Sequence, residues 1–249
     1  MYLGVTKQHI FYTAGKCGTQ TLNAITGLRE ICPIDTALSL NLRKTARREL
    51  ERTRLQQDLP VVCIIRNPEK RLISGLFQVL AKQLFGTVFY TIINNNYGEQ
   101  RFVEYAEVLY DERFWNQAIE RYLRATSPAW NPNAELESHR AQYHYGNWLA
   151  DVQEIKATVP DCTIVDTEQL SEFLKNNGYE HEPRNTADYF LYAMYLDNKE
   201  LRQHYDSLLD IPRMTQAFRA GWNSQLPEWS DKVNKYLIPE IQRYKDLVG

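Results

Sequence analysis

The chain has 249 residues, of which 43% are hydrophobic and 24% are charged. This composition is typical of a globular protein and excludes disordered and collagen-like chains. Lys and Arg together number 29 and Asp and Glu 31, so the formal net charge is −2. The strong basic excess of general nucleic-acid binders is therefore absent.

The sequence contains no apolar run close to the roughly 20 residues that span a bilayer. Its start lacks the charged and then apolar pattern of a secretory signal. We therefore expect a soluble, cytoplasmic protein with no membrane span and no nucleic-acid partner, folded as one domain over residues 1–249.

Cysteine and histidine spacing argues against several classes of protein. The four cysteines form no CxxC pair, which argues against a structural zinc site and a disulfide framework. Neither Cys17 nor Cys63 is followed six positions later by the arginine of a cysteine-phosphatase loop. The five histidines include no HExxH pair. We therefore expect no metal.

The N-terminal third alternates between strand and helix patterns. A β-prone run at 9–13 precedes a glycine-containing loop, and apolar residues at near-helical spacing from Leu22 to Ile31 then predict a helix. A long charged helix is expected over 36–57. The continuous apolar run at 61–65 is typical of a strand buried on both faces of a parallel sheet.

Later segments continue this alternation. Asn67 and Pro68 are suited to cap and begin a helix after the 61–65 strand. A helix is predicted around 112–124, and a third strand at 162–165 that leads into a helix cap at 166–169.

From residue 186 onward we expect mostly helices, broken near 210–212 and again near 226–227. The pattern as a whole predicts an α/β fold with three layers. Its central sheet would be parallel, with a P-loop-like strand-loop-helix near the N-terminus and a helix-rich C-terminal half.

The first candidate anion site is the loop that follows the 9–13 strand. A glycine loop at a helix N-terminus presents backbone N–H groups and the positive end of the helix dipole. Lys16 adds a charge, and Thr19 and Thr21 add hydroxyl groups. The loop is not a Walker A sequence, because Ile10 and Cys17 stand where glycine and Ser/Thr are required.

The second candidate anion site follows the 61–65 strand. Arg66 stands where the strand ends, and ligands of open α/β sheets bind beyond the carboxyl ends of the strands. Helical spacing places Asn67, Lys70, Arg71 and Ser74 on one side of the next helix, opposite an apolar stripe. Arg66 and Ser74 can therefore converge on a second anion.

Together the two segments resemble the sulfotransferases that use 3′-phosphoadenosine 5′-phosphosulfate (PAPS). Residues 16–22, Lys-Cys-Gly-Thr-Gln-Thr-Leu, resemble the K-x-G-T-x-x-L phosphosulfate loop of the carbohydrate-modifying branches. Residues 66–74, Arg-Asn-Pro-Glu-Lys-Arg-Leu-Ile-Ser, resemble the 3′-phosphate motif R-[DN]-P-x-x-R-x-x-S.

The resemblance implies transfer of a sulfuryl group from PAPS to an acceptor hydroxyl or amine, leaving 3′,5′-ADP and requiring no metal. Lys16 would neutralise charge on the leaving phosphate. Arg66 and Ser74 would hold the 3′-phosphate. The residues implied at the 5′-phosphate are Lys16, Cys17, Gly18, Thr19, Gln20 and Thr21.

Two further residues complete the predicted site. His139 is the predicted general base, with His144 and Glu30 as alternatives, because an acceptor hydroxyl needs a group that titrates near neutral pH. Arg219, in an Arg-x-Gly segment, is predicted to contact the nucleotide. The acceptor could be a carbohydrate, a lipid or another small molecule. A nucleotide or nucleoside kinase and a non-catalytic 3′,5′-ADP-binding module are the alternative functions.

Overall fold

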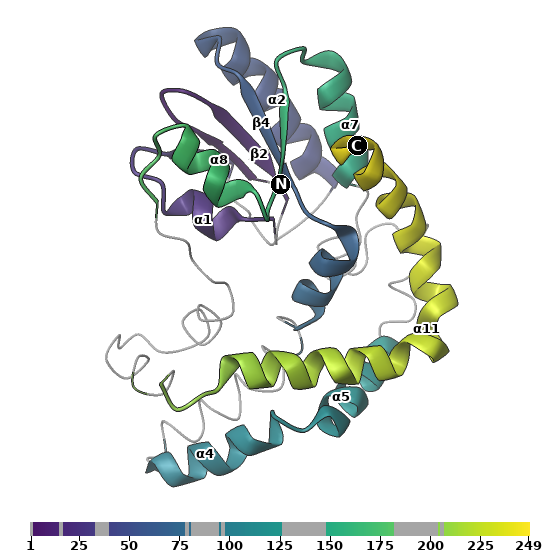
Figure 1. Cartoon of the computed structure of the whole chain (residues 1–249). Helices are drawn as coiled ribbons and strands as arrows, with labels where there is room; N and C mark the ends of the chain where they lie inside the picture. Colours follow the sequence, from purple (N-terminus) through teal and green to yellow (C-terminus); the bar gives the residue numbers. More distant parts are fainter. Residues whose placement is uncertain are drawn as a thin grey trace. The chain divides into compact units, whose positions relative to one another are not determined.

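The computed structural model describes residues 2–14, 17–32, 40–77, 80, 95, 98–125, 148–181, 204 and 207–249 (Figure 1). The chain packs as two compact units. The first, here called the sheet unit, comprises Met1–Leu72, Ala129–Arg184 and Asn234–Gly249. The second, the helical unit, comprises Ile73–Pro128 and Asn185–Val233. The expectation that the chain is one sulfotransferase-like domain stays a prediction.

The sheet unit is built on five strands in the order β3-β1-β2-β4-β5. β2 pairs with β4 and β4 with β5 in parallel, whereas β1 is antiparallel to both β2 and β3. The α/β class is confirmed, but the sheet is mixed, with only its core parallel, rather than parallel throughout. The strands are β1 (Tyr2–Val5), β2 (Ile10–Thr13), β3 (Arg29–Cys32), β4 (Val61–Ile65) and β5 (Thr163–Asp166).

Helices pack on both faces of this sheet, because successive strand residues point to opposite faces. On one face Ile10, Tyr12 and Cys63 pack against α2 (Leu40–Gln57) and α7 (Trp148–Thr158). On the other face Phe11 and Ile64 pack with α1 (Thr19–Asn23) and α8 (Leu170–Asn176) (Figure 1).

The strands predicted at 9–13, 61–65 and 162–165 correspond to β2, β4 and β5. The prediction of a helix from Leu22 to Ile31 is wrong after Asn23. α1 ends at Asn23, and Ile31 lies in β3, which pairs with β1. Gly27, at φ +79°, lies in the turn between the two elements, in a conformation that glycine adopts readily.

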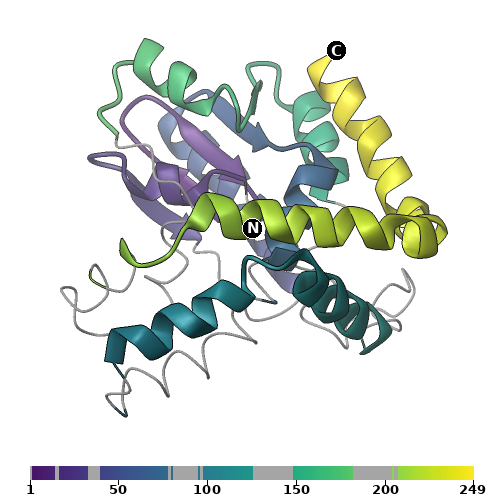
Figure 2. The same cartoon turned by 60° about the horizontal axis from the view of Figure 1, so that its bottom comes forward.

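The described part of the helical unit contains α4 (Gly98–Val108), α5 (Glu112–Ala125) and the first part of α11 (Ile211–Val248). The predicted helix around 112–124 is thus confirmed as α5. Figure 2 shows α5 alongside α11. The ring centroids of Trp115 and Phe218 lie 5.2 Å apart between these two helices, and both residues are buried.

The break expected near 210–212 is confirmed as the start of α11, where the Asp210 carboxylate accepts a hydrogen bond from Arg213 N at 3.0 Å. The break expected near 226–227 is not found, because α11 continues to Val248. Pro227 therefore lies inside a helix, where proline removes one backbone hydrogen bond but does not always end the helix. In the described part of the chain, no helix combines the length and apolarity needed to cross a membrane.

Candidate functional site

The three parallel strands end at the same level of the sheet. Thr13 of β2 is in register with Ile64 of β4, and Ile65 of β4 with Asp166 of β5. The segments that follow the strands therefore leave the sheet along one edge. We call this region the carboxyl-edge site, and ligands of open α/β sheets bind in this position.

The loop after β2 is fastened to the sheet by Thr13. The buried Thr13 Oγ1 lies 3.0 Å from the carbonyl oxygens of both Cys17 and Ile64 and can donate its hydrogen to either. Cys17 N donates a bond of 3.3 Å to Ala14 O. The described ends of the loop are thus held by internal hydrogen bonds. Lys16 lies outside the described residues.

Gly18 begins α1 with φ +78°, in the left-handed region that favours glycine. A Cβ atom at this position would lie 2.6 Å from Leu170 Cδ2 of α8. The turn into α1 therefore favours this glycine, and a larger residue would displace the end of the Leu170 side chain.

Two arginines from the second motif lie near the loop. Burial raises the pKa of the Cys17 thiol to about 11, while the positive charges of Arg71 and Arg66 oppose the rise. Burial lowers the pKa of the half-buried Arg66, against the effect of neighbouring groups that include Asp166. Arginine stays charged over any ordinary pH range. The segment after β4 thus brings two guanidinium groups toward the loop that follows β2.

Arg71 is the functional candidate that the sequence pattern misplaced. Helical spacing put it on the polar side of its helix, but its side chain is only 6% exposed. Its guanidinium lies over the Trp148 ring, 5.4 Å from the ring centroid. It is also near enough to the buried Glu240 for its charge to oppose the burial that raises the pKa of that carboxyl. The sequence signal that could have identified Arg71 as a site residue is its position as the second arginine of the 66–74 motif.

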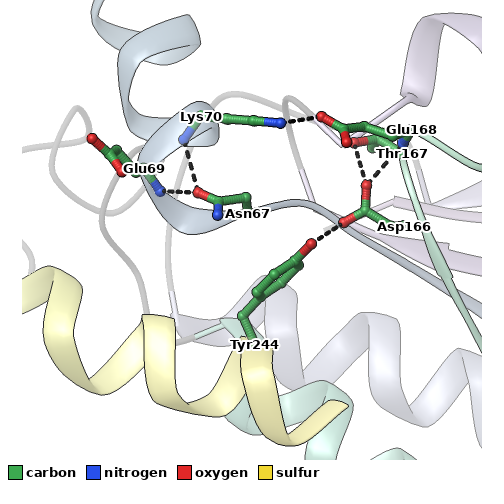
Figure 3. Close-up of polar contacts among 7 residues, drawn as sticks. All are labelled: Asn67, Glu69, Lys70, Asp166, Thr167, Glu168 and Tyr244. Atoms are coloured by element: carbon green, nitrogen blue, oxygen red, sulfur yellow. Dashed lines mark hydrogen bonds and ion pairs between the residues drawn. The ribbon is translucent and has the colours of Figure 1, made fainter. Parts of the chain in front are cut away.

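Carboxylates at the end of β5 are held by other partners (Figure 3). Asp166 accepts hydrogen bonds from Glu168 N at 2.8 Å and from the Tyr244 hydroxyl at 2.7 Å. Glu168 forms an ion pair with Lys70, which lowers the pKa of Glu168. Lys70 therefore adds little net positive charge to the carboxyl-edge site. Its other described charges are those of Arg66 and Arg71 and of the Asp166 carboxylate, which acts on Arg66.

The helix cap at the start of the second motif is confirmed. Asn67 Oδ1 accepts hydrogen bonds from Glu69 N at 3.0 Å and Lys70 N at 3.2 Å (Figure 3). Residues 68–77 are helical, and Ser74 lies two turns along with a half-buried side chain. Sequence reasoning thus identified how the chain enters this helix.

The remaining predicted residues are spread over the molecule. Thr19 is buried and Thr21 half-buried in α1, where Gln20 also lies. Glu30, an alternative base, is exposed on β3, and Arg219 is exposed on α11 in the helical unit. His139 and His144 lie outside the described residues.

Gly221 belongs to the same Arg-x-Gly segment as Arg219. It lies inside α11, and a Cβ atom there would be 2.8 Å from Asn116 N and 2.9 Å from Glu112 O of α5. Its lack of a side chain is explained by the close approach of two helices.

No protein-family model, curated protein or solved structure matches the chain. The fold class is α/β with a mixed five-stranded sheet. The residues of the carboxyl-edge site therefore carry the functional proposal.

Proposed function

We propose that the protein is a PAPS-dependent sulfotransferase with a P-loop-like phosphosulfate loop. The observation that carries this proposal is that Thr13 ties the loop between β2 and α1 to β4, where the charges of Arg66 and Arg71 also act on Cys17. Two sequence segments that each resemble a phosphate motif of this family thus come from neighbouring parallel strands and lead to one edge of the sheet.

The charges near the loop suit a ligand with two separated phosphate groups. Arg66 and Ser74 would hold the 3′-phosphate, and Thr19, Thr21 and backbone N–H groups from Gly18 to Gln20 the 5′-phosphate. The backbone N–H of Cys17 already donates a hydrogen bond to Ala14 O, so we propose no phosphate contact for that N–H. Guanidinium groups form strong charge-assisted hydrogen bonds to phosphate oxygens.

Lys16 would stabilise the negative charge that develops on the leaving phosphate oxygen during sulfuryl transfer. Preorganised charge of this kind can supply a large part of a rate enhancement. A base near the acceptor hydroxyl would take its proton, and His139, His144 and Glu30 are the candidates. Arg219 is proposed to contact the nucleotide.

Thermal unfolding in the presence of nucleotides tests the binding step. We expect 3′,5′-ADP at roughly 100 times its Kd to stabilise the protein by about 2.7 kcal/mol, equally with and without a metal chelator. Stabilisation by ATP and magnesium alone would instead favour a kinase and would overturn the proposal.

Transfer from radiolabelled PAPS to pooled carbohydrate, lipid and phenol acceptors tests the chemistry. Lys16→Met should reduce kcat much more than it weakens 3′,5′-ADP binding, because its charge acts mainly in the transition state. Binding of 3′,5′-ADP without transfer to any pool would indicate a non-catalytic binding module.

A further inference from the structure

Two cysteine thiols meet between neighbouring strands of the sheet unit. The Sγ atoms of Cys63 and Cys162 are 3.6 Å apart, although the residues are 99 positions apart in sequence. Cys63 lies in the middle of β4 and is fully buried, whereas Cys162 is partly exposed. Both pack with the same hydrophobic cluster, on the α2 and α7 face of the sheet.

The pair is separate from the carboxyl-edge site. Cys162 comes immediately before β5, whose first residue, Thr163, is in register with Val62 of β4. It therefore lies toward the amino ends of these strands. Its backbone N–H donates a bond of 3.1 Å to Val159 O in the turn that precedes the strand.

The surroundings of the two thiols differ in a way that gives them different reactivity. The hydrogen bond between the two thiols lowers the pKa of Cys162, and the positive charge of Lys156 acts in the same direction. The hydrogen bond to Cys162, together with burial, raises the pKa of Cys63. Solvent also reaches Cys162 more readily, because it is partly exposed and Cys63 is fully buried. Since the thiolate is the nucleophile, Cys162 is the one that reacts first with a reagent from solvent.

We propose that Cys162 and Cys63 are a reversible oxidation site that forms an intramolecular disulfide with peroxides. The partly exposed Cys162 is the attacking thiol, and the buried Cys63 beside it is the resolving thiol. This inference is independent of the proposed sulfotransferase activity.

The chemistry balances in two steps with hydrogen peroxide as oxidant. The Cys162 thiolate attacks one peroxide oxygen, the O–O bond breaks, and the departing hydroxide takes up a proton to form water. The Cys162 sulfenic acid is then attacked by the Cys63 sulfur. An S–S bond forms as the S–O bond breaks, and the released hydroxide leaves as a second water with the Cys63 thiol proton.

The geometry requires a modest movement. The sulfur atoms must approach from 3.6 Å to a bond length of about 2.05 Å. Cys162 lies just outside the β4–β5 ladder, so its side chain and the turn before it can move without breaking the strand pairing.

Peroxide treatment of the native protein, followed by alkylation and peptide mapping, tests the proposal. We expect a loss of mass equal to two hydrogen atoms and a cross-linked peptide pair joining Cys63 to Cys162, both reversed by dithiothreitol. Cys32 is the internal control, because it is also partly exposed but its pKa is raised by burial. It should be oxidised more slowly than Cys162, in line with its smaller thiolate fraction.

Variants separate the two roles. Cys63→Ala should react with peroxide more slowly, because Cys162 loses the thiol contact that lowers its pKa, and should stop at a Cys162 sulfenic acid that dimedone traps. Cys162→Ser should lose the disulfide, whereas Cys32→Ser should keep it. Accumulation of Cys162 sulfenic acid in the native protein without a cross-link would overturn the proposal. The same holds if Cys32 is oxidised as fast as Cys162. If a variant fails to fold, peptide mapping of the peroxide-treated native protein still shows whether the disulfide between Cys63 and Cys162 forms.

Discussion

Gly18 illustrates how one residue can serve both the fold and the site. Its φ of +78° and the position of Leu170, 2.6 Å from a hypothetical Cβ, are independent constraints. Glycine in a phosphate loop is usually interpreted through the ligand alone. Here the packing of α1 against α8 is a sufficient reason for the residue.

Gly18→Ala should destabilise the protein even without ligand. We expect a backbone cost of roughly 1–2 kcal/mol and an overpacking cost of roughly 1–3 kcal/mol in the free energy of unfolding from urea titration. Gly178→Ala is the matched control, with φ +73° and no atom within 4 Å of the hypothetical Cβ. It should show only the backbone cost. Equal losses in the two variants would exclude the contact with Leu170.

His9 provides a second test at the level of a single residue. Its Nδ1 lies 2.7 Å from the hydroxyl of Tyr179, and burial lowers the pKa of its imidazole. Thr6 also contacts this hydroxyl, at 2.8 Å. His9 directly precedes β2, so it lies at the amino end of this strand and away from the carboxyl-edge site.

A lowered pKa in the folded state means that the fold favours neutral His9. The associated stability is therefore present above about pH 6.5, the pKa of an unperturbed histidine, and is lost as the pH falls through the lowered folded value. Urea unfolding of His9→Gln should show a weaker loss of stability between about pH 7 and 5 than the native chain. An identical pH profile for both proteins would contradict this account.

At the scale of elements, strands in the parallel core were the most predictable. The uniform apolar run of β4 and the β-prone run of β2 reflect burial on both faces of the sheet, and the cap at Asn67 follows from its own side chain. These signals are local, so the sequence contains them.

Edge and terminal elements were less predictable because their structure depends on distant partners. β1 includes Gly4 and was not predicted, although it is as long as β2, while β3 is exposed at two of its four positions and pairs with β1. The burial of Arg71 was also hard to predict, because it depends on Trp148 from a distant part of the chain. Helical periodicity alone could not identify that partner.

The contact between α5 and α11 gives a test at this scale. Gly→Ala inside a helix normally gains about 1 kcal/mol, but Gly221→Ala would force a methyl group onto the backbone of α5. We expect a net loss of at least roughly 1 kcal/mol in the free energy of unfolding. Asn223→Ala, at an exposed position of the same helix, should instead be neutral or stabilising. A stabilised Gly221→Ala would contradict the close approach.

At the scale of the whole molecule, two compact units share helices. Residues 68–77 and α11 each begin in one unit and continue into the other. The sheet unit contains Arg66, Arg71 and the described ends of the loop, and the helical unit contains Arg219.

We propose that the carboxyl-edge site binds a ligand with both 3′- and 5′-phosphate groups. Calorimetric titration of 3′,5′-ADP into the native protein, Arg66→Ala and Arg54→Ala tests it most directly. Arg54 is the matched control, because it is an arginine at the end of α2 whose ion pair of 3.3 Å with Asp161 lies at the opposite edge of the sheet.

We expect the native protein and Arg54→Ala to bind 3′,5′-ADP alike and to prefer it to 5′-AMP. Arg66→Ala should lose roughly 1.5–3 kcal/mol of binding free energy, the usual value of a hydrogen bond to a charged group, and with it the preference for the 3′-phosphate. Absence of 3′,5′-ADP binding to the native protein, or equal weakening in Arg54→Ala and Arg66→Ala, would contradict the account.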